Sequence, residues 1–187
     1  AATDGSSQWI TGETARARVH VDRARRDAII VGTGTVLADD PRLTARKPDG
    51  TLHGHQPLRV AVGRKEIPDD AAIRGGFAPG EYVGAAAAEA GKFRHIQTRD
   101  MSVVVDVLAD LVIIDVLVEG GPRLAGAFLS AGLVDAVESY VAPGLLGAGT
   151  AVVDTASATT VDDIVRFRTI GVELLGDDVL IKSVRKG

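Results

Sequence analysis

The sequence predicts an α/β protein: a three-layer sandwich with a mixed, mostly parallel sheet and a C-terminal antiparallel hairpin. Three observations lead to this prediction. Short apolar runs, which are typical of buried strands, alternate along most of the chain with segments whose apolar residues recur at helical spacing. Glycines soon follow the apolar runs that end at residues 31 and 118, as expected where a strand turns sharply into another element. Near the C-terminus, Gly-Asp-Asp at 176–178 separates two further runs, which is a hairpin signal.

Length and composition limit the class of protein. The chain has 187 residues, 45% of them hydrophobic, which is enough for one domain with a sizeable core. The formal net charge of −4 argues against a nucleic-acid or membrane-surface binder, since both need a basic face. The chain has no cysteine, which excludes disulfides and thiolate zinc sites, and no apolar run reaches the roughly 18 residues of a membrane-spanning helix. We therefore expect a cytoplasmic, single-domain protein without a metal site.

The first half of the chain is organised around the apolar run Ala-Ile-Ile-Val at 28–31. The patterns there predict a helix over 11–26, strands over 28–31 and 58–62, a loop over 47–57 and a turn over 67–70 followed by one helical turn. Arginines make the first helix the most basic element, and a solvated helix face is the simpler interpretation for most of them. The least regular part is 75–93, where only a short strand at 81–85 is indicated.

The second half continues the alternation of strand and helix. The patterns predict strands over 94–98, 113–118 and 134–141, helices over 102–111 and 122–132, a glycine-rich loop over 145–149, and hairpin strands over 166–175 and 179–184. Pro122 suits the first turn of a helix, because the N–H groups of that turn have no intrahelical acceptor and proline lacks an N–H. Strands that alternate with helices usually pair in parallel, and a hairpin pairs antiparallel, so a mixed sheet is expected.

Residues 32–46 read Gly-Thr-Gly-Thr-Val-Leu-Ala-Asp-Asp-Pro-Arg-Leu-Thr-Ala-Arg and concentrate polar groups directly after the first strand. The two glycines allow the backbone to turn tightly or to approach a ligand closely. Asp39 and Asp40 can act as an acid/base pair, but Asp-Asp-Pro is also a common turn composition. Arg42 and Arg46 can bind a phosphate or simply face water. The pattern predicts a polar site at a strand end, and by itself it does not distinguish that site from a turn.

A second polar turn, Glu-Gly-Gly-Pro at 119–122, joins the strand over 113–118 to the next helix. Paired glycines bring backbone amides close to a ligand and a helix N-terminus adds partial positive charge, so this turn suits a phosphate. It lacks the Gly-Lys-Ser/Thr of a P-loop and the glycine spacing of a dinucleotide-binding fingerprint. A tight strand-to-helix turn without a ligand is the alternative.

Two other features carry less weight. His53 and His55 stand two residues apart in the predicted loop, but no carboxylate cluster accompanies them, so solvated histidines are the better interpretation. Trp9 is the single tryptophan, and a lone tryptophan more often belongs to a core, although its polar neighbours place it near the surface.

Six segments match one family in the same order along the chain: 7–11, 35–44, 118–126, 131–135, 141–143 and 145–147. Through them the chain resembles the reductase domain of the bifunctional riboflavin-biosynthesis deaminase/reductase, and the match covers nearly everything except 64–112. The resemblance implies a dihydrofolate-reductase-like fold, NADPH as hydride donor and 5-amino-6-(5-phosphoribosylamino)uracil as substrate. It also implies a homodimer. Hydride transfer to C1′ of the ring-opened ribosylamine would give a ribitylamine.

The resemblance also assigns roles to residues. The substrate-binding positions that it implies are Ser7, Arg23, Leu43, Arg46 and Glu119. The cofactor-binding positions that it implies are Trp9, Thr35, Asp39, Gly121, Pro122, Arg123, Leu124, Ala125, Gly126 and Ala127. Guanidinium groups bind a sugar phosphate well, and the backbone amides of a helix N-terminus bind a cofactor phosphate well. Elementary chemistry therefore agrees with the separation into substrate-binding and cofactor-binding residues. Because an imine accepts hydride best when protonated, a carboxylate should stabilise the iminium, and Glu119 and Asp39 are the catalytic candidates.

The sequence departs from the family pattern in two ways. The family has a strand upstream of the Ser-Gln-Trp motif, and nothing in this chain corresponds to it. Family members often carry an N-terminal zinc deaminase domain with cysteine ligands, which this chain cannot contain. We therefore expect a reductase domain over 1–187 that is either a fragment of a larger protein or a stand-alone enzyme. The alternatives are a reductase of the same fold acting on a pterin, and an inactive nucleotide-binding domain that supports a deaminase.

Overall fold

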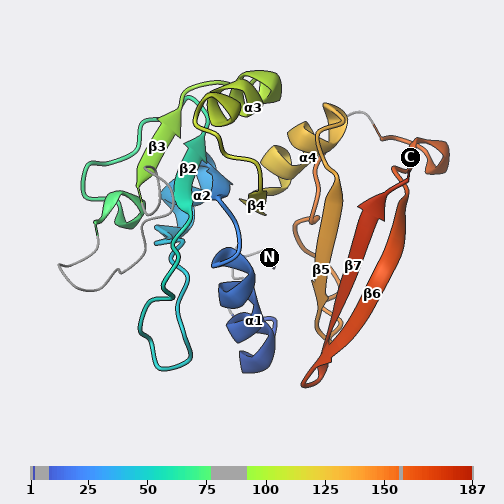
Figure 1. Cartoon of the computed structure of the whole chain (residues 1–187). Coiled ribbons are helices and arrows are strands. Elements are labelled where there is room, and N and C mark those ends of the chain that lie inside the picture. Colours follow the sequence, from blue (N-terminus) through green and yellow to red (C-terminus); the bar gives the residue numbers. More distant parts are fainter. Residues whose placement is uncertain (1, 3–8, 77–91, 156–157, 187) are drawn as a thin grey trace.

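The computed structural model describes residues 2, 9–76, 92–155 and 158–186 (Figure 1). Four parallel strands form one sheet in the order β3-β2-β1-β4: β1 (Ala28–Gly32), β2 (Leu58–Val62), β3 (Phe93–Ile96) and β4 (Val116–Gly120). Every residue of β2 is buried, as is typical of a central parallel strand with helices on both faces. The predicted strands over 28–31 and 58–62 are confirmed, and the predicted strand over 81–85 lies outside the described residues.

Helices cover both faces of the parallel sheet. On one face lie α2 (Thr33–Asp39) and the short 3-10 helix η1 (Ala72–Arg74), and on the other lie α3 (Met101–Asp110) and α4 (Pro122–Ser130). Successive side chains of a strand point to opposite faces, so Ile29 packs in one core cluster and Ile30 in the other. The predicted three-layer α/β sandwich is confirmed.

The C-terminal strands form a second, antiparallel sheet in the order β5-β7-β6: β5 (Ala136–Val141), β6 (Phe167–Leu175) and β7 (Asp178–Arg185). The hairpin expected around 176–178 is confirmed. In the described part of the chain the strands occupy two sheets, whereas one mixed sheet was expected. Among the described strands, β4 pairs with β1 and β5 pairs with β7, so no described strand joins the two sheets. Each of β4 and β5 therefore leaves one edge without a described partner strand.

The helix α1 (Glu13–Arg23) connects the two sheets, and in Figure 1 it lies between them together with α4. Its buried Asp22 accepts a hydrogen bond of 2.5 Å from the Tyr140 hydroxyl of β5. Arg18 donates from Nε to Asp22 and from Nη1 to Glu173 of β6. The helix begins after Gly12, whose N–H donates to the Asp178 carboxylate at 2.7 Å. These contacts fix α1 against the C-terminal sheet.

Three further differences from the sequence prediction concern helices and strand ends. The helix α2 was not predicted, because Gly32 at its N-cap and Thr33, Gly34 and Thr35 at its first three positions favour a loop. Burial of Thr33 and Val36 stabilises the helix nonetheless. The fourth strand is displaced toward its C-terminus and ends at Gly120. A short 3-10 helix, η2 (Val161–Asp163), follows a capping box formed by Thr160. Among the described residues, no helix is both long and apolar enough to cross a membrane.

Candidate active site

The two polar turns predicted from the sequence meet at the carboxyl ends of β1 and β4. These strands pair in parallel, with Val31 opposite Gly120, so α2 and α4 start from neighbouring strand ends. Gly121 has φ of 78°, which favours glycine. A Cβ built on Gly121 would lie 3.1 Å from the Thr35 hydroxyl oxygen, so the backbone of one turn packs against a side chain of the other. Ligands of open parallel sheets bind at such strand ends.

Arg23 and Glu119 form the central charged pair of this region. Arg23 Nε donates to Glu119 Oε1 at 2.7 Å and Nη2 donates to Oε2 at 2.5 Å, which is a bidentate arrangement. The side chains are only 18% and 16% exposed. The pair joins the last turn of α1 to the end of β4, two elements that are 96 positions apart in the sequence. Of the predicted substrate-binding residues, the structure brings these two into direct contact.

The segment 43–46 runs beside this pair and carries a second guanidinium. Leu43 is buried with φ of 53°, an uncommon backbone conformation for a leucine that fixes the path of the chain. The Thr44 carbonyl accepts from Arg23 Nη1 at 3.2 Å, and the Thr44 hydroxyl accepts from Arg46 Nε at 3.0 Å. Arg46 also donates from Nη1 to the Gly50 carbonyl at 2.9 Å. Thr44 therefore links both predicted phosphate-binding arginines.

The N-terminus of α4 fits a cofactor phosphate. The first intrahelical bond runs from the Ala125 N–H to the Gly121 carbonyl at 3.1 Å, so the amides of Arg123 and Leu124 precede the hydrogen-bonded ladder. The glycine turn leaves space where a Cβ would crowd Thr35. These amides, which make no intrahelical hydrogen bond, and the helix dipole suit the phosphates of a dinucleotide.

The remaining members of the predicted cofactor turn are placed as follows. Leu124 is buried in the core, and a Cβ on Gly126 would clash with the Asp154 carbonyl, so the segment around Asp154 passes directly beside α4. The Asp154 N–H donates to the Pro122 carbonyl at 3.0 Å. Ala127, a residue of α4, is partly buried and packs against the core cluster between α4 and the parallel sheet. Gly126 is thus required for the close approach of two backbones.

Among the described residues, no hydrogen bond or ion pair joins Asp39 or Trp9 to the charged pair. Asp39 is exposed at the end of α2. Trp9 is largely exposed, with the Arg16 guanidinium carbon 4.6 Å from its ring centroid. Ser7 lies outside the described residues.

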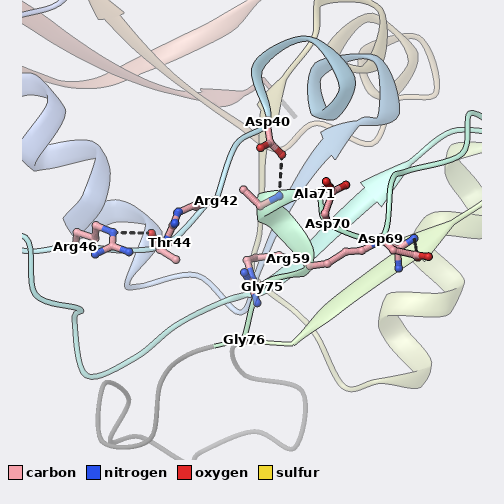
Figure 2. A pocket seen from close by; sticks show the side chains of 12 residues that line it. Asp40, Arg42, Thr44, Arg46, Arg59, Asp69, Asp70, Ala71, Gly75 and Gly76 are labelled. Carbon is pink, nitrogen blue, oxygen red and sulfur yellow. Dashed lines mark hydrogen bonds and ion pairs between the residues drawn. The ribbon is translucent and has the colours of Figure 1, made fainter.

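A cavity of about 530 Å³ lies on the other side of the 40–46 segment (Figure 2). Its lining combines four arginines with three aspartates, namely Arg42, Arg46, Arg59, Arg74, Asp40, Asp69 and Asp70. The Asp40 carboxylate already accepts the Ala72 N–H at 2.7 Å, and Arg74 donates to the Pro68 and Ile67 carbonyls. Arg42 and Arg46 of the predicted polar stretch both line this cavity, whereas Arg23 and Glu119 do not.

Two residues that support the site were not singled out from the sequence. His20 is half-buried on α1, with Nδ1 3.1 Å from the Thr44 carbonyl oxygen, and burial followed by the neighbouring Arg23 lowers its pKa. Gln56 is buried and bonds to both the N–H and the carbonyl of Ala45. A signal existed for His20, which precedes Arg23 by three positions and so shares its helix face. For Gln56 the sequence holds no comparable signal.

Comparison with known proteins places the chain among close relatives. The chain is 44% identical over 186 residues to the riboflavin biosynthesis protein RibD of Mycobacterium tuberculosis, covering 100% of the chain and 50% of the relative. It is 47% identical over 155 residues to RibD of Corynebacterium ammoniagenes, covering 81% of the chain and 41% of the relative. The chain thus spans about half the length of these relatives.

Solved structures resemble this chain over its whole length. Acinetobacter baumannii RibD superposes with a TM-score of 0.78 at 31% identity, covering 100% of this chain and 54% of that chain. A Thermotoga maritima structure described as a diaminohydroxyphosphoribosylaminopyrimidine deaminase/5-amino-6-(5-phosphoribosylamino)uracil reductase superposes with a TM-score of 0.76 at 27% identity, covering 100% and 52%. The family model described as the RibD C-terminal domain matches residues 1–181. The chain therefore belongs to the RibD C-terminal domain family.

Proposed function

We propose that this domain is an NADPH-dependent reductase that converts the ribosyl group of 5-amino-6-(5-phosphoribosylamino)uracil to a ribityl group in riboflavin biosynthesis. The observation that carries the proposal is the half-buried Arg23–Glu119 pair, which lies at the strand end that leads into the glycine turn and α4. A sugar phosphate and a dinucleotide are both anionic. The site offers guanidiniums for the first and helix N-terminal amides for the second.

The residues of the site have distinct tasks in this proposal. A guanidinium has five N–H donors, and within the described residues Arg23 uses three of them for Glu119 and Thr44. The other two can bind a phosphate or a sugar hydroxyl. Arg46, fixed by Thr44 and Gly50, supplies further donors. The backbone amides at the start of α4 hold the cofactor phosphates. Together these groups orient C1′ of the substrate toward the nicotinamide, which supplies the hydride when NADPH is bound.

The reaction needs one hydride and one proton. Ring opening of the ribosylamine gives a C1′=N imine, and protonation of its nitrogen makes C1′ a better hydride acceptor. Hydride adds to C1′ while the π electrons of the C=N bond pass to nitrogen as a lone pair, giving the ribitylamine. The Glu119 carboxylate stabilises the positive charge of the iminium before the hydride arrives. Glu119 suits this role better than Asp39, because a shielded charge acts more strongly than the exposed carboxylate of Asp39.

A two-step titration tests the proposal. NADPH is first added to the protein while its fluorescence is followed, and the phosphoribosylaminouracil is then added while NADPH absorbance is recorded. We expect saturable NADPH binding followed by oxidation of the cofactor. Absence of NADPH binding would refute the proposal and also the pterin-reductase alternative. Binding without oxidation would support an inactive nucleotide-binding domain or another substrate, and adding a dihydropterin separates these two.

We further propose that the upstream strand that the family pattern includes lies between the free edges of β4 and β5. Parallel strands are usually buried, yet all five residues of β4 are only half-buried, while every residue of β2 is buried. A strand there would satisfy the outward backbone groups of both edges and join the two sheets into one mixed sheet.

A chain that carries about 20 upstream residues from its own gene would test this. The amides on the free edges of β4 and β5 should then exchange with solvent at least about tenfold more slowly, because they gain backbone partners. Hydrogen exchange read by mass spectrometry gives the comparison, with the fully paired β2 as the internal control. Unchanged exchange at both edges would refute the placement.

We propose that the domain forms a homodimer through β6. This edge strand exposes Ile170, Val172 and Leu174 by more than half each. Val172 and Leu174 stand on alternate positions and hence on one face, and Ile170 lies in the irregularity that precedes them. Val172→Glu should weaken self-association by about 100-fold, since it puts a charge into an apolar contact. Light scattering over a concentration series measures this, with Val105→Glu on α3 as the control. A wild type that stays monomeric at all concentrations would refute the dimer.

A further inference from the structure

The segment that carries Arg46 is held from two sides. Its Ala45 is fixed by the buried Gln56, whose Oε1 accepts the Ala45 N–H at 2.9 Å and whose Nε2 donates to the Ala45 carbonyl at 2.7 Å. The neighbouring backbone groups point the opposite way, toward α1. There, His20 Nδ1 lies 3.1 Å from the Thr44 carbonyl oxygen and 3.3 Å from the Arg46 backbone nitrogen. One imidazole nitrogen thus contacts both backbone groups that flank Ala45.

The hydrogen-bond requirements of these two groups differ. The Thr44 carbonyl has a second donor, Arg23 Nη1 at 3.2 Å. In the described part of the chain, the Arg46 N–H has no acceptor other than His20 Nδ1. Nδ1 accepts only when it carries no proton, so a neutral ring with its hydrogen on Nε2 satisfies the Arg46 amide. A ring protonated on Nδ1 can only donate to the Thr44 carbonyl, and the Arg46 N–H then loses this acceptor.

We propose that neutral His20 is a positioning residue for the substrate phosphate, acting through the Arg46 amide. By holding that amide, Nδ1 keeps the Arg46 backbone in place while the Thr44 hydroxyl and the Gly50 carbonyl hold its guanidinium. Because Thr44 also accepts from Arg23, the same contact fixes the spacing of the two arginines. The inference rests on the proposed function, since it assumes that these arginines bind a sugar phosphate.

Charged groups from four parts of the fold surround His20. Arg23 lies on the same helix, Arg46 on the adjoining segment, Glu119 at the end of β4 and His53 in the following loop. Burial, then Arg23 and to a smaller extent His53, lower the His20 pKa, while the Thr44 carbonyl and Glu119 oppose them. The folded protein therefore binds this proton less readily than the unfolded chain, whose histidine pKa is about 6.5. Acidification below about pH 6.5 should both destabilise the fold and release the Arg46 amide.

Two substitutions test the inference through kinetics. His20→Asn keeps a polar atom as many bonds from Cα as Nδ1, whereas His20→Ala removes it. We expect the alanine variant to raise the KM for the phosphoribosylaminouracil by about tenfold, in line with one lost hydrogen bond of ~1–1.5 kcal/mol. The asparagine variant should stay within about threefold of wild type, and kcat and the KM for NADPH should change little in both.

A purely structural role gives a different result. In that case His20→Ala would lower the unfolding temperature but leave the substrate KM unchanged, and the inference would be refuted. The pH profile adds a second criterion. As the pH falls below about 6.5, the substrate KM of wild type should rise more steeply than that of His20→Asn, which has no titrating ring. Equal slopes would contradict the inference.

A readout without turnover separates this inference from the proposed function. Hydrogen exchange of the Arg46 amide should be slow in wild type and His20→Asn and at least about tenfold faster in His20→Ala. If the wild type fails to reduce the substrate, the proposed function fails, and equal exchange in all three proteins refutes the contact itself. Should the alanine variant not fold, the wild-type NMR titration decides. An Arg46 amide shift that follows the His20 ring supports the contact, and one that does not refutes it.

Discussion

Replacing Arg23 with alanine should raise the KM for the phosphoribosylaminouracil by about 100- to 1,000-fold. Truncating one partner of a shielded, hydrogen-bonded charge pair costs about 2–5 kcal/mol, and each 1.4 kcal/mol is a factor of ten. Arg23 makes two bonds to Glu119 and one to Thr44, so its loss removes a ligand donor, exposes an unpaired carboxylate and loosens the segment 43–46. The KM for NADPH should remain nearly unchanged, because α4 and the glycine turn stay intact. Steady-state kinetics with each substrate varied in turn measures both constants.

Arg26→Ala is the matched control for this experiment. Arg26 follows α1 closely, and its Nη1 donates to both carboxylate oxygens of Asp115, at 3.0 and 3.1 Å. That pair lies before the start of β4, at the opposite end of the strand from Glu119. Arg26 Nη2 also donates to Glu138 of β5 at 3.1 Å. The control therefore removes the same charge and breaks ion pairs that do not involve Glu119 or Thr44, so it should leave both KM values within about twofold. Similar losses in Arg23→Ala and Arg26→Ala would mean that net charge or stability, and not the site, explains the effect.

Glu119→Gln completes the comparison, since it keeps the size of the side chain and removes its charge. If Glu119 stabilises the iminium, kcat should fall about 100-fold, within the range of a single acid–base or electrostatic group. The double variant Arg23→Ala/Glu119→Gln should lose less than the sum of the single losses, because the two side chains act as one unit. Unchanged turnover in Glu119→Gln would remove this residue from the chemistry and return Asp39 as the candidate.

The strands and turns that form this site could be predicted from the sequence, but the contacts between their side chains could not. The apolar run at 28–31 and the Glu-Gly-Gly-Pro turn were recognisable because strand hydrophobicity and turn chemistry are local properties. The pairing of Arg23 with Glu119 spans 96 positions and depends on where α1 packs, which no local pattern encodes. The family resemblance marked both residues as substrate positions. Their bidentate contact, and the role of Thr44 between the two arginines, emerged only from the structure.

The errors have equally physical causes. The helix α2 was missed since its Gly-Thr-Gly-Thr start has low helix propensity, and the tertiary burial of Val36 outweighs it. The predicted parallel and antiparallel strands are both present, and among the described residues they form two sheets, a division that the sequence could not predict because strand patterns reveal burial but not which edges pair. The chain turns at Asp40, with φ of 40°, and Asp40 and Arg42 line the cavity that Thr44 and Arg46 also line, an arrangement that no local pattern encodes.

Replacing Asp22 with leucine should lower the free energy of unfolding by about 3–5 kcal/mol, the cost of breaking a buried ion pair from one side. The Asp22 side chain is 5% exposed and accepts from Arg18 Nε and the Tyr140 hydroxyl, so its loss leaves a guanidinium and a phenol with unmet hydrogen bonds. Asp115→Leu is the control, because that carboxylate pairs with Arg26 but is 49% exposed; it should cost at most about 1 kcal/mol. Urea unfolding gives both values, and similar costs would refute the special role of the buried contact.

Tyr140→Phe distinguishes the hydrogen bond from the ion pair. It removes only the hydroxyl group that bonds β5 to α1. The free energy of unfolding should fall by about 1.5–3 kcal/mol, as for a hydrogen bond to a charged group. Burial, and then the bond to Asp22, raise the pKa of the Tyr140 phenol. The folded state therefore retains this proton where the unfolded chain loses it, so wild-type stability should fall as the pH rises above about 10. The phenylalanine variant should lose less stability over the same pH range, because it has no phenol to ionise at this position. An equal alkaline loss of stability in both proteins would show that the Tyr140 hydroxyl does not hold α1, and with it Arg23, against the C-terminal sheet.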